Sequence, residues 1–114
     1  MFLLLLTGCA GSTAYVFVNE APNAFREELA RYFHAKDMSV EFVDTAVPEG
    51  LNKNIIITSY LPRDPGKIVE IQRELRELGI DIEEVLIGSR DHNHHYSGDN
   101  IGVYIVSGIT QSNL

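Results

Sequence analysis

The segment 91–96 holds the densest group of metal-binding side chains in the sequence, and it reads DHNHHY. Neutral imidazoles bind zinc or nickel, and a carboxylate such as Asp91 or Asp99 can act as a fourth ligand. In an extended segment, residues two apart place their rings on one side. The segment does not match the helical H-E-x-x-H pattern and has no distant second set of ligands. We therefore predict an exposed polar hairpin loop that binds metal only adventitiously. The alternative is a specific metal site, made by His92, His94 and His95.

A single thiol, Cys9, lies close to the amino terminus, in the opening MFLLLLTGCAGS. Leu6-Thr-Gly-Cys9 resembles the lipobox of bacterial lipoproteins: an aliphatic residue, two small residues and a cysteine. In that family the thiol receives a diacylglycerol, a peptidase cleaves before the cysteine, and the new amino group is acylated. Two or more acyl chains on one residue give stable anchoring. Because Ala10 rather than an aspartate follows, the resemblance implies delivery to the outer membrane.

The segment before Cys9 departs from a complete signal peptide. It has no Lys or Arg, and its apolar run of residues 2–6 is shorter than the usual ~7 to 15 residues. We therefore expect residues 1–8 to be a truncated signal-peptide-like segment, left by a misplaced start codon or by trimming. The alternative is that residues 2–6 form a buried strand, with Cys9 as a small core residue of a cytoplasmic protein. The run is far below the ~20 residues that a transmembrane helix needs.

Composition and motifs argue against several other functions. The chain has 9 basic and 16 acidic residues, a net charge of -7, and no basic patch. This charge balance argues against nucleic-acid binding. One cysteine cannot form an internal disulfide. No G-x-x-x-x-G-K or G-x-G-x-x-G loop occurs, and the sequence offers no convincing pair of nucleophile and base. We therefore predict a non-enzymatic protein without a cofactor other than the covalent lipid.

Hydrophobic periodicity predicts five strands and two helices. Phe25, Leu29 and Phe33 recur at helical spacing after Pro22, and a second helix starts at Asp64-Pro65 and stops at Gly79. Its apolar positions repeat at intervals of 3, 4 and 3 residues. Apolar runs rich in β-branched residues predict the strands, which we place at 14–18, 39–43, 54–58, 85–87 and 101–106.

The element order β-α-β-β-α-β-β predicts an α/β (α+β) fold. We expect a two-layer sandwich with two amphipathic helices on one face of a four- to five-stranded mixed sheet. The other face would be open or covered by the amino-terminal segment. This single domain would span residues 14–108, after a lipidated cysteine and short tether at 9–13 and before a tail at 109–114.

The segment 55–106 resembles the second half of OmpA-like periplasmic domains. The features that carry the resemblance are the strand IIITSY, an Asp-Pro-Gly loop, a helix ending in LGI before DIEEV, a polar loop and the final N-IGVYIV. The layout is also similar to that of lipoproteins of Tad-type pilus assembly. Its element order is similar to that of SPOR-type cell-wall domains.

The OmpA-like resemblance implies a peptidoglycan site, but the motif is incomplete. That family uses T-D-x-x-G and N-x-x-L-S-x-x-R-A, whose Asp and Arg grip the carboxylates of the diaminopimelate stem. Here the strand ends in Thr-Ser-Tyr, and the helix lacks Leu-Ser and Arg-Ala. Asp64 and Arg73 are the nearest residues of the required types, with Arg63 or Arg76 as assistants.

These observations favour an outer-membrane lipoprotein on the periplasmic face, anchored through Cys9. We expect it to act as an accessory or scaffold component of an envelope assembly of the secretion or pilus type. An open strand edge would pair with a larger envelope protein. The alternatives are a peptidoglycan-binding OmpA-like or SPOR-like module and a small protein that binds metal through its histidine loop.

Overall fold

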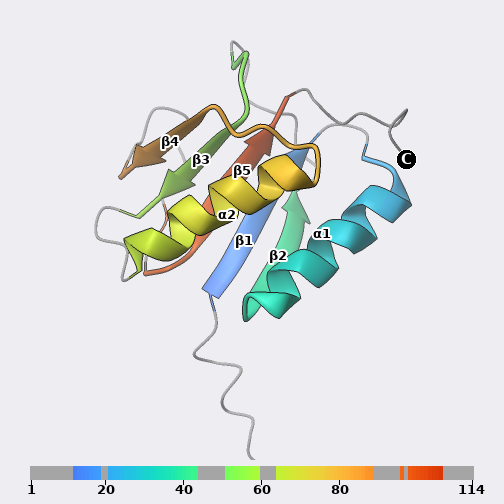
Figure 1. Cartoon of the computed structure of the whole chain (residues 1–114), viewed down its shortest axis with the longest axis horizontal. Helices are drawn as coiled ribbons and strands as arrows, with labels where there is room; N and C mark the ends of the chain where they lie inside the picture. The colour runs from blue at the N-terminus through green and yellow to red at the C-terminus, as the bar shows by residue number, and fades with distance from the viewer. Residues whose placement is uncertain are drawn as a thin grey trace, which may run out of the picture.

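The computed structural model describes residues 12–18, 21–43, 51–59, 64–88, 96 and 98–106. Two helices and five strands follow one another in the predicted order (Figure 1). They are β1 (Ser12–Val18), α1 (Asn23–Ala35), β2 (Met38–Val43), β3 (Ile55–Thr58), α2 (Pro65–Glu77), β4 (Glu84–Ile87) and β5 (Ile101–Ile105).

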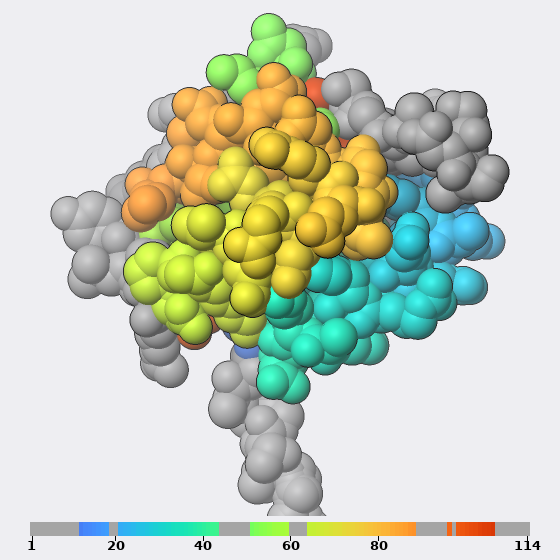
Figure 2. Space-filling model, in the orientation of Figure 1, coloured from blue at the N-terminus to red at the C-terminus, as the bar shows by residue number. Residues whose placement is uncertain are grey.

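The five strands form one mixed sheet in the order β2-β1-β5-β3-β4. β1 is parallel to both β2 and β5, β3 is parallel to β4, and β3 is antiparallel to β5. α1 connects the parallel pair β1 and β2, and α2 connects the parallel pair β3 and β4. Both helices lie side by side on the same face of the sheet (Figures 1 and 2). The structure thus confirms the predicted two-layer α+β sandwich.

The helices form where the apolar spacing predicts them. α1 buries Phe25, Leu29 and Phe33 against the sheet. α2 buries Ile68, Ile71 and Leu75, and its first turn is capped by Asp64, whose carboxylate accepts a hydrogen bond from the Lys67 amide at 3.1 Å. It ends before Gly79, which adopts a φ of 92°, a conformation that glycine accepts without steric cost. The three isoleucines of β3 are buried because this strand lies inside the sheet.

The face of the sheet opposite the helices carries a second apolar cluster. Phe17, Ile55, Ile57 and Tyr104 are buried there, and Leu51 and Tyr96 are among the partly buried residues that pack against them. The Phe17 and Tyr104 rings are stacked with centroids 4.5 Å apart. Of the two alternatives for this face, a fully open face does not fit, because these four side chains are buried. The amino-terminal segment, which is the other alternative, lies outside the described residues.

The folded domain begins two residues earlier than predicted. β1 starts at Ser12 because Ser12 and Thr13 pair with the first two residues of β2, and the Thr13 amide donates a 2.8 Å hydrogen bond to Asn100. The predicted tether is shorter by those two residues. Cys9, the histidine loop at 92–95, Arg63 and the tail at 109–114 lie outside the described residues.

Candidate functional site

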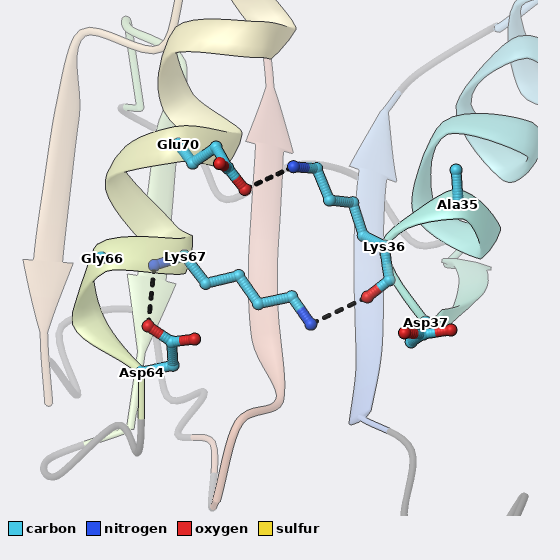
Figure 3. Close-up of a pocket in the computed structure, with 7 residues that line it drawn as sticks. All are labelled: Ala35, Lys36, Asp37, Asp64, Gly66, Lys67 and Glu70. Carbon is cyan, nitrogen blue, oxygen red and sulfur yellow. Dashed lines mark hydrogen bonds and ion pairs between the residues drawn. The ribbon is translucent and has the colours of Figure 1, made fainter.

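An open groove of about 440 Å³ lies between the end of α1 and the beginning of α2. Both helix ends meet there because α1 runs back to the start of β2, while α2 leaves the end of the antiparallel β3. The lining residues come from the α1–β2 turn and the first turns of α2 (Figure 3). They are Ala35, Lys36, Asp37, Asp64, Gly66, Lys67 and Glu70.

Lys36 joins the two helices across this groove. Its ammonium group lies 2.5 Å from a carboxylate oxygen of Glu70 and 2.7 Å from one of Glu74. The hydroxyl of Tyr32, one turn earlier on α1, donates a 2.8 Å hydrogen bond to Glu74. One cation and one hydroxyl from α1 therefore satisfy two adjacent carboxylates of α2.

Lys67 makes the reciprocal connection from α2 to α1. Its ammonium donates a 2.8 Å hydrogen bond to the main-chain carbonyl of Lys36 (Figure 3). Carbonyls at the carboxyl end of a helix have no partner within the helix and carry the negative end of its dipole. The next residue, Asp37, adopts a φ of 61°, a left-handed conformation that Asp tolerates better than most side chains. The sharp turn it makes lets β2 start directly beneath the groove.

The ionisation of the group follows from these contacts. Hydrogen bonds from Lys36 and then from Tyr32 lower the pKa of Glu74. The same contacts with Glu70 and Glu74 raise the pKa of Lys36. Burial, and then the hydrogen bond to Glu74, raise the pKa of Tyr32. These contacts favour the charged forms of Lys36 and Glu74 and the neutral phenol of Tyr32.

The two residues predicted to grip a peptidoglycan stem peptide do not share this groove. Asp64 is the cap of α2, and Arg73 lies nine residues further along, about 13.5 Å away along the axis at 1.5 Å per residue. Arg73 lies close enough to influence Tyr32 and Glu74 electrostatically. The predicted assistant Arg76 instead pairs with Asp81 at 3.3 Å.

Sequence reasoning missed the groove residues Lys36 and Lys67. Lys36 and Glu70 are 34 positions apart, so no local spacing connects them. The available signal was a lysine just beyond the end of a predicted helix, where cations are favoured. The histidine loop lies outside the described residues. Within the described ranges, no three histidine, cysteine or acidic side chains are grouped as metal ligands would be.

None of the helices in the described ranges is both long enough and apolar enough to cross a membrane. Comparison of the chain with protein-family models, with curated proteins and with solved structures found no match.

Proposed function

We propose that this protein is a non-enzymatic lipoprotein, anchored in the outer membrane through Cys9 and serving as a scaffold or accessory component of an envelope assembly. One observation carries the proposal: the lipobox-like Leu-Thr-Gly-Cys9 is followed almost at once by a folded domain, since β1 begins at Ser12. An anchor that close to a domain holds the domain against the membrane instead of on a long flexible stalk.

The distance from anchor to domain can be bounded. Three residues span at most about 10 Å when fully extended. The end of the sheet at which β1 begins would then face the bilayer. The opposite end, which carries the β1–α1 connection and the last residues of α2, would face the periplasm and be free for an envelope partner.

The described residues support a binding role over a catalytic one. In the groove between α1 and α2, Lys36 pairs with Glu70 and Lys67 bonds the Lys36 carbonyl, so that both lysines connect the two helices. Edge strand β2, at the side of the sheet away from β4, offers main-chain groups that an extended partner segment can pair with. A peptidoglycan-binding role receives no comparable support, because Asp64 and Arg73 are separated by about 13.5 Å along α2.

The experiment that tests the proposal is an intact-mass measurement of the protein isolated from bacterial membranes. The gene is expressed with its natural upstream sequence, and Cys9→Ser serves as the matched control. Acylation of Cys9 at a new amino terminus, absent from the control, is the expected result. An unmodified chain in the soluble fraction would overturn the proposal.

A further inference from the structure

Two large hydrophobic side chains are exposed in the described part of the chain, and they are close to the same end of the domain. Val69 on α2 keeps 59% of its surface accessible, and Ile87 at the end of β4 keeps 62%. Single exposed apolar side chains are ordinary on protein surfaces. Val69 and Ile87 are informative because both lie near the end of the domain that the proposed anchor at Cys9 would hold at the membrane.

The strand register places Ile87 near the end of the sheet at which β1 begins. Ile87 pairs with Thr58, Thr58 with Ile101, and Ile101 with Ala14. Ala14 is only two residues, or about 7 Å, beyond the start of β1. Sideways, β4 is three strand spacings from β1, which is about 14 Å. If Ser12 is held at the membrane surface, a modest tilt of the domain toward β4 therefore brings Ile87 to the same surface.

Val69 lies on the side of α2 that faces the α2–β4 connection. Gln72 donates a hydrogen bond to the Ile82 carbonyl in that connection, and Val69, three residues before Gln72, lies on the same side of the helix. Val69 is also only five residues beyond the Asp64 cap, about 7.5 Å along the axis. Figure 1 shows the tip of β4 and the first turns of α2 on one side of the molecule, and Figure 2 shows their surfaces adjoining there.

We infer that Val69 and Ile87 contact the bilayer surface, so that the domain rests on the membrane along its β4 side. This inference rests on the proposed anchoring through Cys9. The lipid anchor supplies the affinity for the membrane, so the contact between the domain and the bilayer becomes intramolecular. Two side chains then suffice to select one orientation of the domain on the membrane.

A second copy of the chain fits this site less well than a membrane. Two-fold pairing of one β4 edge with another is antiparallel and reverses one domain relative to the other. The two Ser12 residues would then lie at opposite ends of the joined sheet. With tethers of about 10 Å, both copies could not be anchored in one bilayer.

The test uses the full chain, which has one cysteine and no tryptophan. Cys9 is coupled to a maleimide-bearing lipid in phosphatidylcholine vesicles, so the result does not depend on whether cells lipidate it. Ile87→Trp and Val69→Trp then report contact with brominated acyl chains by loss of emission. The matched controls are Glu83→Trp, four residues before Ile87, and Glu77→Trp at the end of α2, both at exposed positions.

We expect brominated lipid to remove more than half of the emission of the Ile87→Trp and Val69→Trp variants and to leave the two controls nearly unchanged. Adding Val69→Ser to Ile87→Trp should weaken the quenching, and adding Glu77→Ser should not. Equal quenching at all four positions, or none at Ile87 and Val69, would overturn the inference. So would emission changes that depend on protein density on vesicles without bromine, because these indicate self-association. An unmodified Cys9 in cells would instead count against the proposed function alone.

Discussion

The hydroxyl groups of Tyr96 and Tyr104 lie 2.7 Å apart on the face of the sheet opposite the helices. Tyr104 belongs to the central strand β5 and is fully buried, whereas Tyr96 precedes that strand. The Tyr96 ring also lies 5.9 Å from the ring of Tyr15. Tyr96, which comes from the connection between β4 and β5, is thus held on the sheet by one hydrogen bond and by ring packing.

Gly102 makes room for this arrangement. A Cβ atom at position 102 would collide with the hydroxyl end of the Tyr96 ring. We expect Gly102→Ala to lower the free energy of unfolding by roughly 1 to 3 kcal/mol, because the added methyl group displaces Tyr96 from Tyr104. Denaturant unfolding measures this effect. In the Tyr96→Ala background the same substitution should cost clearly less, and an equal cost in both backgrounds would contradict the explanation.

Gly66 provides the contrasting substitution. A Cβ atom there would meet only the Asp64 carboxylate, at 3.6 Å, and the residue lies within α2. Alanine restricts the unfolded chain and favours the helix, so Gly66→Ala should raise stability by up to about 1 kcal/mol. A loss of stability measured by thermal or denaturant unfolding would show that the first turn of α2 has less space than the structure indicates.

The protein should lose stability in alkaline solution. Burial raises the pKa of Tyr104 above its ordinary value of 10.0, and the pKa of Tyr32 is raised in the same way. The unfolded chain therefore releases these protons first. Their contribution to stability is complete below pH 10 and is lost as the pH rises through the folded-state values. Denaturant unfolding across this range should show the decline, and Tyr104→Phe should make it shallower. An unchanged slope in that variant would contradict the assignment to Tyr104.

The connection through Lys36 should contribute measurably to the packing of α1 on α2. Lys36→Met removes the cation shared by Glu70 and Glu74 while keeping much of the apolar stem. We expect it to destabilise the protein by about 1 kcal/mol, at the upper end of the range for surface ion pairs. Lys53→Met is the control, since the ion pair between Lys53 and Glu84, at 3.5 Å, is more exposed. Equal effects of the two variants in denaturant unfolding would refute a special role for Lys36.

The sequence was sufficient to predict the layers but not the site. Apolar spacing located both helices, and the Asp64-Pro65 start is seen in the structure. Two features depend on long-range geometry and escaped prediction. β5 inserts between β1 and β3, which decides the strand order. The Lys36–Glu70 pair joins positions that meet only after both helices have packed. The sequence left open whether the second face of the sheet is covered, because Phe17 and Tyr104 lie in strands whose runs are apolar throughout.

The peptidoglycan hypothesis has its own test. If Asp64 acts only as a helix cap, Asp64→Asn should preserve stability and Asp64→Ala should cost about 1 kcal/mol. Because about 13.5 Å along α2 separates Asp64 from Arg73, we expect no pelleting of the protein with purified sacculi. Pelleting that Arg73→Ala abolishes, while leaving the unfolding transition intact, would establish the binding role that we do not favour.

The covalent state of Cys9 decides whether the protein is a lipoprotein. The gene with its natural upstream sequence is expressed in a bacterial host, with and without an inhibitor of the lipoprotein signal peptidase, and the intact mass of the membrane-bound chain is determined. We expect a triacylated Cys9 as the new amino terminus, and retention of the preceding residues when the inhibitor is present. A chain that carries an unmodified Cys9 under both conditions would show that the protein is not a lipoprotein.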